Sequence, residues 1–225
     1  YMFNHRPNSL NAGSLWGRPF YILREAWNIL NAIAEGKIES GDEKKLNALK
    51  GETMAVIALC QFDLTRCFGY PYTKDKGASL GAPLIDHLVG TYENPPRSTV
   101  AQAYDFIIET LEEAVTLMSE EKNNGRMNKY AARALLARIY LYHDDNRKAF
   151  DLADQLIKDA DTSGSYALYP HEKYVAAWSV EAKFGSESFF EIANSVDDTP
   201  GRDSWGYLLN WYGYQKGFVT QKYAE

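Results

Sequence analysis

Apolar residues recur every three or four positions in several segments of the chain, and this spacing places them on one face of a helix. It predicts helices over residues 20–35, 46–67, 99–120 and 128–160, the last interrupted at 144–146. Gly36 closes the first segment, and Gly69 with Pro71 closes the second. The first two helices are expected to form an antiparallel pair. Thr99 and Gln102 have the spacing of a capping box, which predicts a helix start at this position.

The other segments lack this periodicity. Between residues 70 and 97 proline and glycine punctuate the chain, which predicts a long connection without regular structure. After residue 163 aromatic residues are mixed with Gly, Ser, Asn and Asp, which is typical of loops, with a strand-like stretch at 187–192. We therefore expect one domain over 1–225, with a helical part at 16–162 and an aromatic-rich loop region at 163–225.

The pair of helices predicted after Asn128 has the most specific pattern. Small and large residues alternate across the break at 144–146 as they do in a tetratricopeptide repeat, in which small residues let two helices approach closely. The residues concerned are Leu136, Ala137, Tyr140, Ala149, Ala153 and Leu156. One such unit cannot bury its own apolar faces, so the earlier helices should stack against it. The pattern predicts an all-α fold of tetratricopeptide-like helix pairs, with long irregular loop insertions because no strict 34-residue period is present.

Charge and composition exclude several classes of protein. The chain has 24 Lys+Arg against 30 Asp+Glu, a formal charge of −6, which gives no basic field for nucleic acid. The longest apolar run, 54–60, is far shorter than the roughly 20 residues that span a bilayer. The first residues have no apolar signal-peptide region, so any export signal would have been removed or lie upstream. Cys60 and Cys67 lie two helical turns apart, too far for a disulfide, and we expect both to be buried.

Several segments, taken in order, resemble the SusD-like (RagB/SusD) family of nutrient-uptake lipoproteins from the outer membrane of Gram-negative bacteria. The likeness covers roughly residues 16–192, and its order and spacing are specific. It rests on Tyr21 with Asn28-Ile29-Leu30, on Gly51 to Tyr72, on Gly81-Ala82-Pro83-Leu84, on Arg97 to Ile107, and on Gly125 to Leu141. Family members are about twice this length and have a lipidated Cys that is not recognisable here, so we expect an internal fragment. Trp16 lies one position from a Trp common in the family.

The resemblance implies an alpha-alpha superhelix at the cell surface, held at the outer membrane by a lipid anchor outside this chain. It also implies capture of an oligosaccharide and its delivery to a SusC-like, TonB-dependent transporter. A sugar has apolar C–H faces and a polar hydroxyl rim, so its site needs exposed aromatic rings beside amide, carboxylate or Arg groups. The predicted stacking residues are Trp205, Tyr207, Trp211 and Tyr212, and the predicted hydrogen-bonding residues are Asn194, Arg202, Asp203 and Asn210. Trp16 with Asn11, just before the first helix, forms a second candidate edge.

Catalysis is not expected. The four histidines have no metal-ligand spacing, and no H-E-x-x-H motif, phosphate-binding loop or nucleophile elbow is present. Asp197, Asp198 and Asp203 leave a calcium site and an ordinary polar turn open, of which we predict the turn and no metal or cofactor. The alternative function is a helical-repeat scaffold that docks a peptide or protein in its groove, with the late aromatic residues buried.

Overall fold

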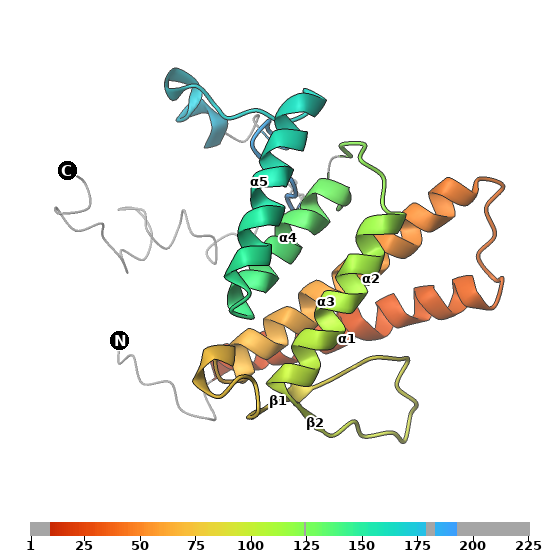
Figure 1. Ribbon diagram of the computed structural model, residues 1–225. Coiled ribbons are helices and arrows are strands. Elements are labelled where there is room, and N and C mark those ends of the chain that lie inside the picture. The colour runs from red at the N-terminus through yellow and green to blue at the C-terminus, as the bar shows by residue number, and fades with distance from the viewer. Residues whose placement is uncertain (1–9, 124, 179–182, 193–225) are drawn as a thin grey trace. The chain divides into compact units, whose positions relative to one another are not determined.

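The computed structural model describes residues 10–123, 125–178 and 183–192, and of 10–12 and 178 the backbone alone. Figure 1 shows a helical fold, as predicted. The α-helices are α1 (Leu10–Ala34), α2 (Glu43–Phe68), α3 (Val100–Leu117), α4 (Lys129–Tyr142) and α5 (Asn146–Ser163). Short 3-10 helices span Tyr72–Lys74, His171–Lys173 and Ala176–Trp178.

Side chains that cap the helices fix where they begin. The predicted capping box is present, because Thr99 Oγ1 accepts from the Gln102 amide while Gln102 Oε1 accepts from the Thr99 amide. Asn128 Oδ1 accepts from the Ala131 amide at the start of α4. Its side-chain nitrogen donates to Tyr166 at 2.7 Å, which ties the start of α4 to the segment after α5.

Helices α1 and α2 form one pair, α4 and α5 form a second, and α3 contacts both α2 and α4. Figure 1 shows α1 and α2 antiparallel, α3 beside α2, and α4 antiparallel to α5. The main apolar cluster joins α2, α3 and α4, with Phe62, Ile107, Leu111 and Ile139 fully or almost fully buried. Gly51 on α2 allows this helix to approach the end of α3 closely, because a Cβ at Gly51 would lie 2.7 Å from Met118 Cγ and 2.9 Å from the Ala114 carbonyl oxygen.

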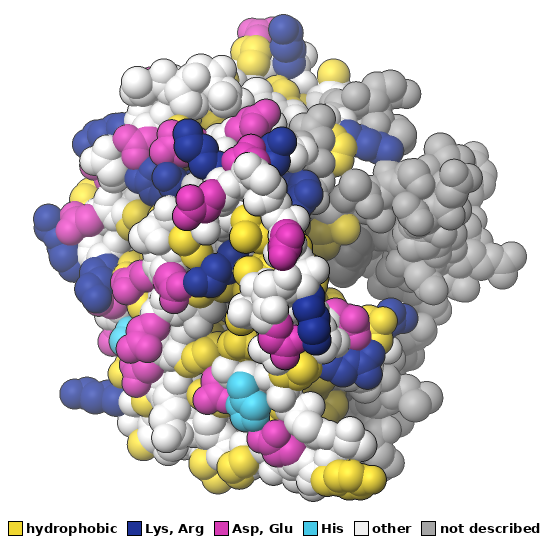
Figure 2. Space-filling model, turned by 90° about the vertical axis from the view of Figure 1, so that its right-hand side faces the viewer, with side chains coloured by type: hydrophobic (Ala, Val, Ile, Leu, Met, Phe, Trp, Pro, Cys, Tyr) yellow, Lys and Arg dark blue, Asp and Glu magenta, His cyan; other side chains and the backbone are white. Residues whose placement is uncertain are grey.

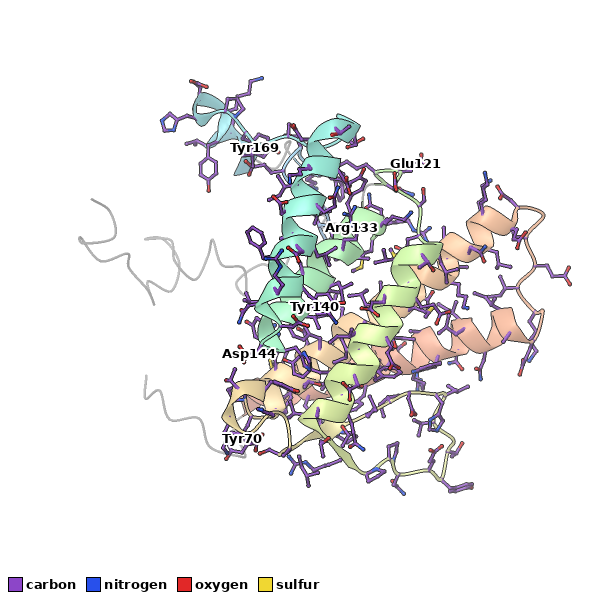
Figure 3. All side chains as sticks on the ribbon, in the orientation of Figure 1. Tyr70, Glu121, Arg133, Tyr140, Asp144 and Tyr169 are labelled. Atoms are coloured by element: carbon purple, nitrogen blue, oxygen red, sulfur yellow. The ribbon has the colours of Figure 1, made fainter. Side chains whose placement is uncertain are left out.

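Polar contacts connect α4 to its partner α5 and to α3. Arg133 on α4 pairs with Asp159 on α5 at 2.7 Å. The Tyr140 hydroxyl donates to Glu112 on α3, and burial raises the pKa of that hydroxyl. Arg133 and Tyr140 both lie on α4 (Figure 3). These contacts join α4 to the helix on each side of it.

The structure differs from the sequence-based expectation at the start of α1 and at Cys67 near the end of α2. Helix α1 begins at Leu10, ten residues before the predicted start, and continues through Pro19. Asn11 and Trp16 therefore lie inside the helix, and the expectation that they precede it is wrong. Cys60 is buried as expected, but Cys67, one residue before the end of α2, is exposed.

Irregular segments also differ from expectation. The connection after α2 contains a two-stranded antiparallel sheet, in which β1 (Leu80–Pro83) pairs with β2 (Arg97–Thr99). These strands are too short for a two-residue periodicity to be read from the sequence. The stretch 187–192 is described and is not a strand, so that expectation is wrong. Within the described residues no helix is long and apolar enough to cross a membrane.

Two compact units divide the chain, Tyr1–Glu191 and Ile192–Glu225. All of the helices and strands named above lie in the first unit.

Candidate binding cleft at Trp16

Most of the predicted site residues lie outside the described residues. This holds for Asn194, Arg202, Asp203, Trp205, Tyr207, Asn210, Trp211 and Tyr212, and they stay predictions. Of Asn11 only the backbone is described, in the first turn of α1. Trp16 is the predicted residue whose side chain can be placed.

The indole ring of Trp16 is held in one orientation and still reaches solvent. Phe20, one turn later on α1, meets it edge-on at 5.1 Å between ring centroids, and Phe68 at the end of α2 meets it at 4.8 Å. Such edge-to-face contacts stabilise a defined ring position. Trp16 keeps 39% of its surface exposed. The ring is thus a fixed and accessible platform.

Trp16 lines a cleft of about 630 Å³ between α1 and the loop that joins β1 to β2. We call it the Trp16 cleft. From α1 it is lined by Trp16, Phe20 and Arg24, and from the β1–β2 segment by Pro83, Ile85, His87, Val89, Gly90, Thr91, Asn94 and Pro95. The cleft combines apolar rings with amide, hydroxyl, imidazole and guanidinium groups.

A buried glutamine anchors the base of the β1–β2 loop. Gln61 on α2 has no exposed surface. Its side-chain nitrogen donates to the Pro83 carbonyl at 3.1 Å, and its oxygen accepts from the Ile85 amide at 3.3 Å. Trp27 on α1 donates from its indole nitrogen to the Ile85 carbonyl at 3.2 Å. Both contacts join the loop to the helices, so the two walls of the cleft have a fixed spacing at this end.

The far part of the loop is held by its own charged groups. The His87 ring nitrogens lie 2.6 Å from Asp86 and 2.7 Å from Glu93. Hydrogen bonds to Asp86 and then Glu93 raise the pKa of His87. Glu93 also accepts from the Gly90 amide at 3.0 Å, and this bond, followed by His87, lowers the pKa of Glu93. We call Asp86, His87 and Glu93 the His87 clasp.

Arg24 supplies the cationic group on the α1 wall. Its guanidinium donates to Glu25 at 2.8 Å and lies 4.9 Å from the centroid of the Tyr21 ring. The hydrogen bond to Glu25, followed by the charge of that carboxylate, raises the pKa of Arg24. The positive charge of the Arg24 guanidinium is thus balanced by the Glu25 carboxylate.

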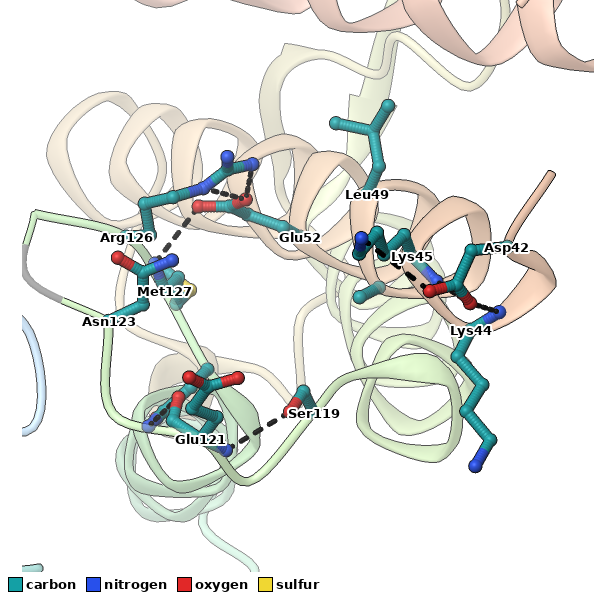
Figure 4. A pocket seen from close by; sticks show the side chains of 12 residues that line it. Asp42, Lys44, Lys45, Leu49, Glu52, Ser119, Glu121, Asn123, Arg126 and Met127 are labelled. Carbon is teal, nitrogen blue, oxygen red and sulfur yellow. Dashed lines mark hydrogen bonds and ion pairs between the residues drawn. The ribbon is translucent and has the colours of Figure 1, made fainter. Parts of the chain in front are cut away.

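Figure 4 shows a second concave site, of about 650 Å³, between the start of α2 and the segment before α4. No aromatic ring is among its lining residues. Its charged groups bind one another: Arg126 donates to Glu52 at 2.9 Å, and Glu52 accepts from the Met127 amide at 3.0 Å. This polar groove therefore offers no platform for an apolar sugar face.

Charges of both signs are interspersed on the described surface shown in Figure 2, with apolar side chains between them. Within the described residues no three His, Cys, Asp or Glu side chains form a group that could hold a metal ion. The Trp16 cleft has a fixed and exposed aromatic ring on one wall, and sequence periodicity could not find its loop side.

Stacked helix pairs joined by long loops place the chain among all-helical proteins of the tetratricopeptide type. The model of the SusD-like family, described as starch-binding associating with outer membrane, matches residues 4–141. This is more than half of the 225 residues, and the chain belongs to the SusD-like family. Comparison with curated proteins gave no match.

Solved structures agree with this assignment. A SusD superfamily protein from Bacteroides thetaiotaomicron is 39% identical, with a TM-score of 0.76 over 81% of this chain and 39% of that protein. A Bacteroides vulgatus protein proposed to bind sugar is 37% identical, with a TM-score of 0.85 over 94% of this chain and 48% of that protein. A laminarin-binding SusD-like protein, 22% identical with a TM-score of 0.63 over 86% of this chain and 40% of that protein, shares the fold. The chain spans less than half the length of these relatives.

Proposed function

We propose that this chain binds an oligosaccharide and that the Trp16 cleft is one of its contact sites. The observation that carries the proposal is the Trp16 ring, which is held by Phe20 and Phe68 yet 39% exposed on a cleft wall. The description of the family as starch-binding supports the same ligand class.

The cleft has the chemistry that a sugar requires. The C–H face of a pyranose is apolar and stacks on a flat ring, whereas its hydroxyls need donors and acceptors at the rim. Trp16 provides the ring. Thr91 and Asn94 provide uncharged hydroxyl and amide groups from the β1–β2 loop. A volume of about 630 Å³ lies within the range of about 300–1,000 Å³ that is typical of ligand sites.

At the level of the whole protein, we propose a role in glycan uptake at the outer membrane. The protein would be anchored by lipid outside these residues, would face the cell exterior, and would pass its oligosaccharide to a SusC-like, TonB-dependent transporter. Family membership supports this role. The aromatic residues after 193 stay proposed as further stacking groups. We propose binding without catalysis, because the family description names binding alone.

One observation favours the alternative of protein docking. Helix α5 exposes two large apolar side chains one heptad apart, Phe150 at 64% and Ile157 at 65%. Large apolar side chains that lie on one exposed helix face often mark protein contacts. Docking on α5 and sugar binding at the Trp16 cleft use different surfaces, so the two proposals can be tested separately.

Affinity gel electrophoresis tests the sugar proposal. The chain is run through gels that contain starch or laminarin, the two glycans named for its family and for one relative. We expect retardation by at least one of them, and a loss of at least about tenfold in affinity, or ~1.4 kcal/mol, in Trp16→Ala. Phe150→Ala is the control, because Phe150 is an exposed ring on α5 that does not line the cleft. Retention that is equal in wild type and Trp16→Ala, with both variants folded by circular dichroism, would exclude the cleft.

A further inference from the structure

The geometry of the His87 clasp specifies a protonation state. Both ring nitrogens of His87 lie within 2.7 Å of carboxylate oxygens, Nδ1 of Asp86 and Nε2 of Glu93. An ionised carboxylate has acceptors only, so each ring nitrogen must donate to keep its bond. A neutral imidazole has a single N–H and can donate once, whereas the imidazolium donates twice. The clasp as it stands therefore requires a protonated His87.

Loss of the proton would change the clasp locally. One ring nitrogen would then turn a lone pair toward a carboxylate, and one of the two bonds would be replaced by repulsion. Glu93 is also the residue that accepts from the Gly90 amide. Loosening Glu93 would thus release the turn at Gly90 as well as the His87 ring.

The clasp and the cleft share the same loop. His87 and Gly90 line the Trp16 cleft directly, and Thr91 and Asn94 line it on either side of Glu93. The base of the loop is anchored by Gln61 and does not depend on charge. Protonation therefore acts on the half of the loop that carries the polar rim of the cleft.

We infer that the His87 clasp is a protonation-dependent fastener of one wall of the Trp16 cleft, so that saccharide binding there is strongest when His87 is charged and weakens when it loses its proton. The part of this inference that concerns saccharide binding rests on the proposed function. The state of the clasp itself is a property of the protein without ligand.

The charged groups around the clasp and the cleft come from the loop and from α1. On the loop they are Asp86 and Glu93 of the clasp itself, and on α1 they are Arg24 with its partner Glu25. The pKa of His87 is raised from 6.5, so the stabilisation of the clasp by the charged His87 is fully present below pH 6.5 and is lost as the pH rises through the raised pKa. The pKa of Glu93 is lowered from 4.5, so the stabilisation of the clasp by the ionised Glu93 is present above pH 4.5 and is lost as the pH falls through the lowered pKa. The clasp is closed between these limits.

The first test needs no saccharide. The ring protons of His87 are followed by NMR as the pH is raised, with His87→Gln used to assign the signal, and the exchange protection of the Gly90 amide is measured in parallel. We expect His87 to titrate above 6.5 and the protection of Gly90 to fall by about two- to tenfold with the same midpoint, the range expected for one exposed hydrogen bond. His171→Gln removes a different exposed histidine and should leave both curves unchanged.

The second test adds maltohexaose and laminarihexaose as probes. Their dissociation constants are measured near pH 5.5 and near pH 8.5, about one unit below and two units above the ordinary pKa of histidine. We expect about two- to tenfold weaker binding at the higher pH for wild type and His171→Gln, and no such change for His87→Gln.

The outcomes separate this inference from the proposed function. A His87 titration at or below 6.5, or Gly90 protection that does not follow it, overturns the clasp whether or not sugar binds. Clasp titration as expected, with neither saccharide bound at either pH, retains the fastener and counts against the sugar proposal. Saccharide binding that is equal at both pH values in wild type overturns the coupling between them.

Discussion

Replacing Gln61 with leucine removes the anchor at the base of the β1–β2 loop while keeping the volume of the side chain nearly constant. Gln61 is a completely buried residue of α2. Its side-chain amide bonds both the Pro83 carbonyl and the Ile85 backbone amide. Leucine fills the space but can bond neither group. The loop must then leave both groups without partners or move away from α2.

The size of the effect follows from the burial of these groups. An unsatisfied buried donor or acceptor costs roughly 1–3 kcal/mol. The Ile85 amide bond is buried and should contribute close to the full range, whereas the Pro83 carbonyl is partly buried and contributes less. We expect Gln61→Leu to lower the free energy of unfolding by ~2–4 kcal/mol. With a urea slope of about 2 kcal/mol/M, the midpoint falls by about 1–2 M.

Urea unfolding followed by circular dichroism measures this change. Gln155→Leu is the matched control, because Gln155 is exposed on α5 and its side-chain nitrogen donates to Asp159 one turn further along the same helix. The control should change stability by less than about 0.5 kcal/mol. Gln61→Leu should also reduce the exchange protection of the Ile85 amide. A loss no larger than that of the control would refute the assignment of Gln61 as the loop anchor.

The remaining predictions concern helix packing and the thiols. Gly51→Ala should destabilise the protein by ~1–3 kcal/mol, because the new Cβ would lie within 3 Å of backbone and side-chain atoms near the end of α3. Gly41→Ala is the control and should not destabilise the protein, because the space around Gly41 is open. Thermal unfolding compares the two variants. Asn128→Ala should lower the free energy of unfolding by ~1–3 kcal/mol, because it removes the cap of α4 and the buried hydrogen bond to the Tyr166 hydroxyl. Urea unfolding measures this change, and a loss below about 0.5 kcal/mol would contradict the prediction. Burial raises the pKa of Cys60 to about 12, so a thiol reagent near neutral pH should modify the exposed Cys67 quickly and Cys60 only on unfolding; two equally fast thiols would show the burial to be wrong.

Regular elements of this fold could be predicted because local rules determine them. Apolar spacing predicted the helices, and the Thr99–Gln102 pair predicted the start of α3. The tetratricopeptide-like pattern after Asn128 predicted the pair α4–α5. The start of α1 could not be predicted in this way, because Pro19 and the polar residues before it interrupt the apolar stripe although the helix continues.

The cleft itself could not be predicted from local patterns. Its loop wall depends on contacts across long stretches of sequence, such as Gln61 with Ile85 and Trp27 with Ile85. Nothing in the spacing of these residues marks them as partners. Trp16 could be proposed from sequence because a sugar site needs an aromatic ring, but its neighbours Phe20 and Phe68 became evident only in three dimensions.

The most direct test of the account is whether a saccharide contacts Trp16. The indole N–H signals of the chain are recorded by NMR while maltohexaose or laminarihexaose is added, and Trp16→Phe assigns the signal of Trp16. We expect the Trp16 signal to shift in a saturable way, and the Trp27 signal, whose indole is bonded to Ile85 at the base of the loop, to shift much less. Saturable shifts that are confined to other tryptophans, with Trp16 unmoved, would contradict the assignment of this cleft.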